Sequence, residues 1–176
     1  PTPGMRDAIA QCRVGDDVID VDPTVAQLQE RIAQLLGKEA AIFMPSGTMT
    51  NQVALRVHCQ PGDEFICEAN CHIYNYEQGA FAQLSGLVAQ TVMGDFGILQ
   101  PAQLVGLIKP DDEHFVRTRL LCLENTVRGK VVSPAYMQSA TDFARSKGLA
   151  CHLDGARAFN AAVKLDIGIS GICCYF

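Results

Sequence analysis

The feature that most constrains the fold is an alternation of short apolar runs with longer amphipathic segments along the 176-residue chain. Short apolar runs between polar turns are typical of buried strands, whereas apolar residues at three- and four-residue steps indicate helices. The expected strands are residues 40–44, 64–67, 87–93, 120–123 and 149–153. Such an alternation predicts an α/β domain with a mostly parallel sheet flanked by helices.

The expected helices begin and end at residues that usually mark helix ends. Asp22-Pro23-Thr24 is expected to open a helix that Gly37 stops, because Asp caps helix starts and Gly readily adopts a left-handed conformation. Further helices are expected after Ser46-Gly47-Thr48, from Gln100-Pro101 to about Lys109, from Ser133-Pro134 to Gly148, and after Asp154-Gly155-Ala156-Arg157. No repeat or linker interrupts the pattern, which favours one domain.

Composition argues against several classes of function. Hydrophobic residues make up 48% of the chain, too many for a disordered segment. The 14 Lys and Arg residues are outnumbered by 19 Asp and Glu, and this net charge of −5 argues against binding nucleic acid. No apolar run reaches the roughly 18 residues that a membrane helix needs. With no targeting segment evident, we expect a cytoplasmic protein that binds neither nucleic acid nor membrane.

The eight cysteines are scattered, with no C-x-x-C pair. Several stand inside apolar runs, where a reduced thiol behaves as a small hydrophobic side chain. Cys67, Cys71 and His72 could be imagined as zinc ligands, but a fourth ligand at a recognisable spacing is missing. We therefore expect no metal site and a reducing compartment.

The turn Ser46-Gly47-Thr48 is the first of three places where polar residues follow a predicted strand. In parallel sheets, ligands bind beyond the carboxyl ends of the strands. The free N–H groups at the start of the following helix favour an anion such as a phosphate, and Gly47 would permit its close approach. A simple helix cap by Ser46 explains the same residues, so the triplet alone leaves both interpretations open.

The other two places where polar residues follow a predicted strand contain Asp154 and His72. Asp154 ends an apolar strand, where a carboxylate needs a cationic partner or good hydrogen bonds. It either pairs with a ligand or caps the next helix beside Arg157. His72 either stacks on a flat ligand or is an ordinary structural histidine.

Taken together, the three places predict a ligand with a phosphate, a flat ring and a group that pairs with a carboxylate. Pyridoxal 5'-phosphate meets all three requirements, because Asp154 would keep its ring nitrogen protonated. Neither G-x-G-x-x-G nor G-x-x-x-x-G-K-[ST] occurs in the chain, which disfavours a dinucleotide or a P-loop nucleotide.

Six segments carry a resemblance to a known family. They are Val14-Gly15-Asp16-Asp17-Val18, Asp22-Pro23-Thr24, Phe43-Met44-Pro45-Ser46-Gly47-Thr48-Met49-Thr50-Asn51-Gln52, Glu68-Ala69-Asn70-Cys71-His72-Ile73, Leu123-Glu124-Asn125-Thr126 and His152-Leu153-Asp154-Gly155-Ala156-Arg157. In this order they resemble the low-specificity L-threonine aldolases, β-eliminating lyases among the fold-type-I pyridoxal-phosphate enzymes. Another fold-type-I lyase or desulfurase is the alternative within this class.

The resemblance implies a fold, a reaction and an assembly. Residues 1–166 would be a partial, PLP-dependent transferase-like large domain of fold type I, and residues 167–176 a tail outside the family. The reaction would be the aldol cleavage of threonine or allo-threonine, which are β-hydroxy-amino acids, to glycine and acetaldehyde. Members of the family form homo-oligomers, dimers or tetramers, and build their sites between two subunits.

The resemblance also assigns roles to individual residues. The cofactor-binding residues would be Ser46, Gly47, Thr48, His72, Asp154 and Arg157. Of these, His72, Asp154 and Arg157 would also be catalytic: His72 stacks on the ring, Asp154 pairs with its nitrogen, and Arg157 contacts the ring hydroxyl or the substrate carboxylate. Glu77 matches an acidic position close to the stacking histidine.

The chain also departs from the family pattern. The Schiff-base lysine of the family lies further beyond the D-G-A-R motif than this sequence extends, and Lys164, the sole lysine after that motif, is expected on the solvent face of a helix. Ile19 stands where a tyrosine is common, and Thr126 is followed directly by Val127-Arg128-Gly129 rather than by the histidine of the family pattern. We therefore expect this chain to be inactive alone. The alternatives are a truncated or decayed product that binds the cofactor weakly, or one that pairs with a full-length subunit.

Overall fold

The computed structural model describes residues 1–176, which divide into two compact units, Pro1–Phe43 and Met44–Phe176. The first unit contains helices α1 (Pro3–Gln11) and α2 (Pro23–Leu36), and the second contains every strand. The predicted domain boundary at residue 166 lies inside the second unit and stays a prediction. No helix combines the length and the apolar character that a membrane span requires.

Helix α2 begins and ends where the sequence predicts. The Asp22 carboxylate accepts hydrogen bonds from the N–H groups of Thr24 and Val25, both at 2.9 Å. Backbone hydrogen bonds, that of Val25 first, lower the pKa of Asp22. Gly37 ends the helix with a φ of 67°, a left-handed conformation that a glycine adopts without strain.

The strand predicted over residues 40–44 is wrong. These residues form no strand, and the side chains of Ile42 and Phe43 are 72% and 53% exposed. The N–H of Phe43 donates to the side-chain carbonyl of Gln29 at 2.7 Å instead of to a neighbouring strand. An apolar run becomes a strand only where another strand supplies hydrogen bonds along its length, and none does so here.

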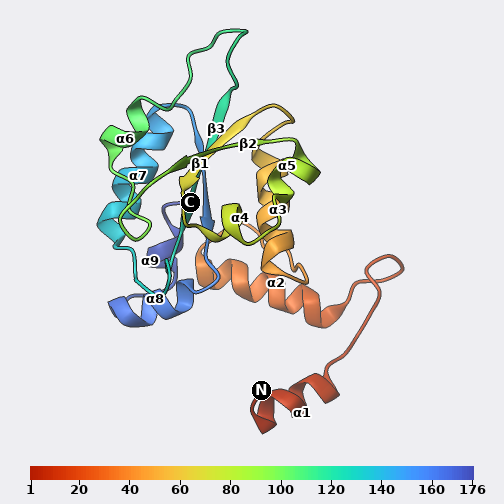
Figure 1. The fold of residues 1–176 in the computed structure, drawn as a ribbon. Coiled ribbons are helices and arrows are strands. Elements are labelled where there is room, and N and C mark those ends of the chain that lie inside the picture. The colour runs from red at the N-terminus through yellow and green to blue at the C-terminus, as the bar shows by residue number, and fades with distance from the viewer. The chain divides into compact units, whose positions relative to one another are not determined.

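The second unit is built on a four-stranded sheet in which every neighbouring pair is parallel, as predicted (Figure 1). The strands are β1 (Glu64–Glu68), β2 (Val88–Val92), β3 (Thr118–Glu124) and β4 (Ala150–Asp154), arranged in the order β2-β1-β3-β4. The chain thus places β2 on one side of β1 and then crosses to the other side for β3. The carboxyl ends of β1 and β3 flank this change of direction, which is the usual ligand position in such sheets.

Helices cover both faces of the sheet, with α3 and α5 on one side and α6 and α7 on the other (Figure 1). Along β1, Phe65 and Cys67 pack with Leu55 of α3, whereas Ile66 packs with Leu104 of α6. This alternation follows from the two-residue period of a strand. The helices of this unit are α3 (Gly47–His58), α4 (His72–Asn75), α5 (Ala80–Ser85), α6 (Pro101–Val105), α7 (Pro134–Ser146), α8 (Ala158–Leu165) and α9 (Ser170–Cys173).

The helices that the sequence predicts begin and end close to their expected positions except at α6, whereas α1, α4, α5 and α9 are not predicted. Ser133 caps α7, and its hydroxyl accepts from the N–H of Tyr136 at 3.3 Å. Helix α6 begins at Pro101 as expected but ends at Val105, several residues before the predicted end near Lys109. Gly106 follows directly, and a glycine is a poor helix former that allows the chain to turn away.

Labelling of the cysteines checks this arrangement of the core. Cys12 and Cys174 are exposed, and we expect only these two to react rapidly with a thiol reagent in the folded protein. Burial raises the pKa of Cys59 to about 11, so roughly one thousandth of it is thiolate at pH 8. The buried thiols should react only after denaturation: Cys59, Cys67, Cys71 and Cys122. Mass spectrometry of timed alkylation tests this; rapid labelling of Cys67 in the native protein would contradict the packing.

Candidate active site

The start of helix α3 leaves backbone N–H groups free at the surface. Ser46 caps the helix, because its hydroxyl oxygen accepts from the N–H of Met49 at 3.1 Å. The N–H groups of Gly47 and Thr48 have no hydrogen-bond partner. A Cβ placed on Gly47 would meet no atom within 4 Å, so the space before these groups is open. The cap predicted for Ser46 is therefore present, and it coexists with donors that suit an anion.

Asp154 lies on the same side of the sheet as the start of α3. It ends β4, and its carboxylate accepts from the side-chain N–H of Asn51 at 2.9 Å. Asn51 stands one helical turn after Gly47 on α3. The second carboxylate oxygen accepts from the N–H of Ala156 at 3.2 Å, which steadies the turn before α8. No ion pair joins Asp154 to Arg157, so that structural alternative is not what the structure shows.

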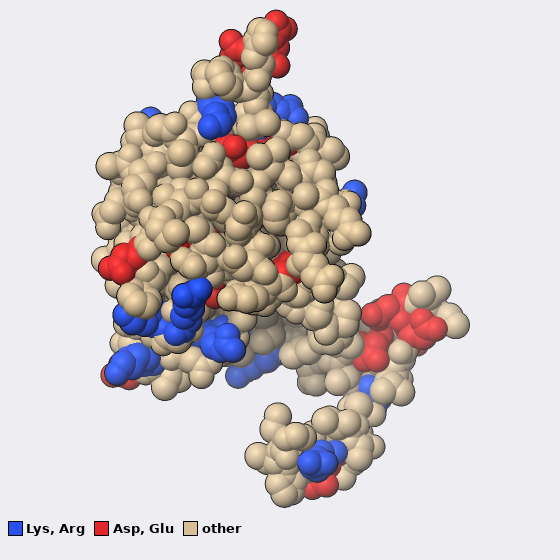
Figure 2. All heavy atoms as spheres, in the orientation of Figure 1, with Lys and Arg blue, Asp and Glu red and all other residues tan.

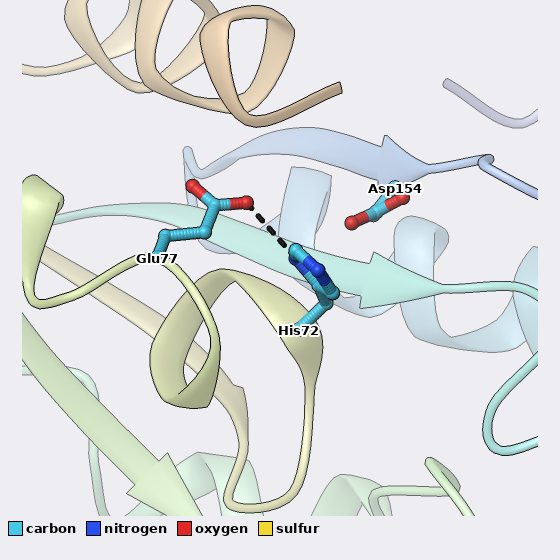
Figure 3. Close-up of side chains that lie close together, drawn as sticks. All are labelled: His72, Glu77 and Asp154. Atoms are coloured by element: carbon cyan, nitrogen blue, oxygen red, sulfur yellow. Dashed lines mark hydrogen bonds and ion pairs between the residues drawn. The ribbon is translucent and has the colours of Figure 1, made fainter. Parts of the chain in front are cut away.

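His72 stands directly beyond β1, at the start of α4, and its ring lies between Glu77 and Asp154 (Figure 3). Its backbone N–H donates to a carboxylate oxygen of Glu124 at the end of β3, at 2.9 Å. Its ring Nδ1 lies 3.1 Å from Oε1 of Glu77, and 46% of the side chain remains exposed. The imidazole is thus held at one nitrogen and open to a ligand elsewhere.

Glu77 is the buried centre of the site. Its side chain has no exposed surface, and its two oxygens accept from Asn51 at 2.8 Å and from Gln52 at 2.6 Å, in addition to the contact with His72. Three partners from two helices thereby satisfy a buried carboxylate that would otherwise be costly.

His152 completes this network from inside β4. Its ring Nε2 lies 2.9 Å from the side-chain oxygen of Asn51. Burial lowers the pKa of His152 from 6.5 to about 4, so the ring is neutral near pH 7. Burial also raises the pKa of Glu124, an effect that the hydrogen bond from the His72 N–H opposes.

Sequence reasoning gave no role to Asn51, Gln52 or His152. One signal was available for His152: it precedes Asp154 by two positions, so both side chains lie on the same face of the strand. Asn51 and Gln52 carried no comparable signal, because polar residues are common on exposed helix faces. Their burial, at 4% and 6% exposure, is apparent only in the structure.

Arg157 lies outside this network. It is exposed and lines an open hollow of about 610 Å³ together with Lys130 and Lys164, between the segment after β3 and helix α8. Figure 2 shows Lys and Arg side chains gathered over the part of the surface where α8 lies. Lys164 is an exposed residue of α8, as the sequence predicts. The hollow is therefore cationic, whereas the network is rich in carboxylates.

Donor atoms of His72, Glu77 and Asp154 lie within 4.8 Å of one another, close enough to share a cation (Figure 3). However, the Asn51 amide already donates hydrogen bonds to both carboxylates, so this cluster is unsuitable as a metal site. The alternative set of Cys67, Cys71 and His72 is also unsuitable, because both thiols are buried and the His72 ring contacts Glu77 instead. A hydrogen bond with Cys71, and then burial, raise the pKa of Cys67 far above its usual range.

Comparison with known proteins gives one consistent result. The chain is 45% identical over 176 residues to a low specificity L-threonine aldolase of Escherichia coli K12, covering 99% of this chain and 53% of that protein. It is 39% identical over 176 residues to low-specificity L-threonine aldolase 1 of Arabidopsis thaliana, covering 96% of this chain and 49% of that protein. The chain thus spans about half the length of the curated relatives it matches.

Among solved structures, a threonine aldolase of Leishmania major superposes with a TM-score of 0.83 at 25% identity, covering 97% of this chain and 52% of that one. The predicted fold class is therefore confirmed: a parallel sheet flanked by helices, as in the large domain of fold-type-I pyridoxal-phosphate enzymes, present over about half of the reference chain. The sequence model of the family described as beta-eliminating lyase matches residues 1–176. Because that match covers the whole chain, the protein belongs to the beta-eliminating lyase family.

Proposed function

We propose that residues 1–176 form the pyridoxal-phosphate-binding part of a threonine aldolase. The threonine aldolase that contains these residues would cleave threonine or allo-threonine to glycine and acetaldehyde. The observation that carries the proposal is the hydrogen bond from Asn51 of α3 to Asp154, since it places a strand-end carboxylate beside the helix whose first N–H groups are free. The threonine aldolases among the relatives support the same conclusion.

The residues present fit each part of the cofactor. The free N–H groups of Gly47 and Thr48, at the positive end of α3, would hold the phosphate. The half-exposed imidazole of His72 would lie against the ring, and the Asp154 carboxylate would pair with the ring nitrogen. When bound, the cofactor would supply an electron-accepting ring that stabilises negative charge at the substrate Cα.

Other side chains around this position would bind the substrate and accept a proton from it. Arg157, exposed beside the cationic hollow, would bind the substrate carboxylate or the ring hydroxyl. With its Nδ1–H donating a hydrogen bond to Glu77, His72 would keep Nε2 free to accept a proton from the substrate hydroxyl. Glu77 thereby sets which nitrogen of the ring is basic.

Residues 1–176 alone are expected to bind the cofactor without a covalent bond and to be inactive. The sole lysine after the D-G-A-R motif is Lys164, and its exposed side chain lines the hollow of Arg157 rather than contacting the network around Asp154. A lysine is the residue that forms the covalent bond with this cofactor.

Equilibrium dialysis of the 176-residue protein with pyridoxal phosphate tests the proposal. We expect saturable binding that dialysis reverses, no cofactor fixed by borohydride, and no acetaldehyde from threonine in an assay coupled to alcohol dehydrogenase. Asp154→Asn should weaken binding about tenfold or more, because a charge-assisted hydrogen bond is lost. The exposed Asp111→Asn is the matched control and should bind as the unmodified chain does.

Two results would contradict the proposal in different ways. An absence of any binding would overturn the cofactor assignment. Cofactor that borohydride fixes to the chain, together with acetaldehyde release, would overturn the expectation that this chain is inactive. Co-purification with a full-length threonine aldolase subunit would instead favour the alternative in which the chain acts by pairing.

A further inference from the structure

A single side-chain amide connects the two carboxylates of the site. The Nδ2 atom of Asn51 donates to Oε1 of Glu77 at 2.8 Å and to Oδ2 of Asp154 at 2.9 Å, and both of its hydrogens are thereby used. The residues it joins come from different segments, since Glu77 follows α4 and Asp154 ends β4. Asn51 is 4% exposed, so water does not compete for these bonds.

The orientation of this amide is set by its partners. With nitrogen and oxygen exchanged, the Asn51 oxygen would face two carboxylate oxygens, and acceptor would oppose acceptor. In the orientation present, Oδ1 instead lies 2.9 Å from Nε2 of His152 and can only accept a hydrogen bond from it. His152 donates this hydrogen bond as a neutral ring protonated at Nε2, because burial lowers its pKa to about 4.

We infer that Asn51 is a positioning residue that holds the Asp154 and Glu77 carboxylates in place, with its own amide fixed by the Nε2–H of His152. It acts on the cofactor only through Asp154 and on His72 only through Glu77. The part of this inference that concerns cofactor binding rests on the function proposed above. The part that concerns His152 can be tested on the protein alone.

The neighbouring residue provides a matched control. Gln52 is also a buried amide of α3 and also donates to Glu77, at 2.6 Å, but it makes no hydrogen bond to Asp154 or His152. Asn51→Leu and Gln52→Leu therefore each remove one buried donor to Glu77. Only the first of them removes the connection to Asp154 and to His152.

The first measurement is the ¹⁵N chemical shift of the His152 ring nitrogens in the 176-residue protein between pH 6 and 8. We expect the Nε2–H tautomer in the unmodified chain and in Gln52→Leu, and a mixture of tautomers in Asn51→Leu. An unchanged tautomer in a folded Asn51→Leu protein would overturn the inference. If Asn51→Leu does not fold, the unmodified chain still decides, because a His152 ring protonated at Nδ1 rather than at Nε2 would overturn the inference.

The second measurement is the affinity for 4'-deoxypyridoxine 5'-phosphate, which carries the phosphate and the ring nitrogen but cannot bond covalently to a lysine. We expect about tenfold weaker binding by Asn51→Leu and by Asn51→Asp, and a change of about twofold or less by Gln52→Leu. Equal affinities of the Asn51 and Gln52 variants would overturn the inference. If the unmodified chain does not bind the probe, the proposed function fails, and the His152 tautomer still decides the role of Asn51.

Discussion

Replacing Glu77 with alanine is expected to lower the free energy of unfolding by about 3 kcal/mol, because it leaves one buried N–H of Asn51 and one of Gln52 without an acceptor. The Glu77 side chain is wholly buried and accepts from both Asn51 and Gln52. Its removal also frees the ring of His72, which it holds at Nδ1. Urea unfolding followed by circular dichroism measures the change.

The conservative variant Glu77→Gln separates the loss of an acceptor from the loss of side-chain volume. It keeps the size of the side chain but turns a donor toward one of the two amides, so it should also destabilise the protein. Glu113→Ala is the control, since Glu113 is an exposed residue and its loss should change stability little. Equal unfolding midpoints for Glu77→Ala and Glu113→Ala would show that the buried network contributes little to stability.

Lowering the pH from 7 to 4 is expected to destabilise the protein by up to about 3 kcal/mol through His152 alone. In the unfolded chain this ring takes up a proton near pH 6.5, whereas burial lowers its pKa in the folded protein to about 4. Between these values the unfolded state binds more protons than the folded state. Stability therefore falls as the pH decreases through this window, and it is restored as the pH rises.

Comparison with a variant isolates the contribution of His152. Glu124 acts with the opposite sign, because a carboxyl group whose pKa is raised by burial favours the folded state as the pH falls. In His152→Gln the amide nitrogen can still donate to Asn51, and the loss of stability between pH 6.5 and 4 should shrink. His114→Gln, which alters an exposed histidine outside the buried network, is the control substitution. Identical pH profiles for the unmodified protein and His152→Gln would contradict the assignment.

The fold was largely predictable, because hydropathy and turn residues report burial and chain direction. The apolar runs at 64–67 and 120–123 lie in strands that pair within the sheet, and the run at 149–153 coincides with β4 except at its first residue. The run at 40–44 has the same character and forms no strand. Hydropathy describes a residue's preference for burial but does not say whether a neighbouring strand is available to pair with it.

The candidate site was predictable only in part. Gly47, His72 and Asp154 could be identified because each opens a helix or ends a strand, where ligands usually bind. The amides that connect them could not, because helical periodicity does not show which polar residue will face a carboxylate distant in the sequence. The roles of the predicted residues toward a cofactor remain proposals.

The bonds of Asn51 also have a consequence for how the protein is made. Its two acceptors lie 26 and 103 residues further along the chain, so one bond closes a short loop and the other a very long one. Closing long loops costs chain entropy and tends to come late in folding. A nascent chain synthesised only as far as β3 already contains Glu77 but offers no second acceptor to Asn51. The hydrogen bonds of Asn51 to Glu77 and Asp154 are therefore complete only when β4 docks.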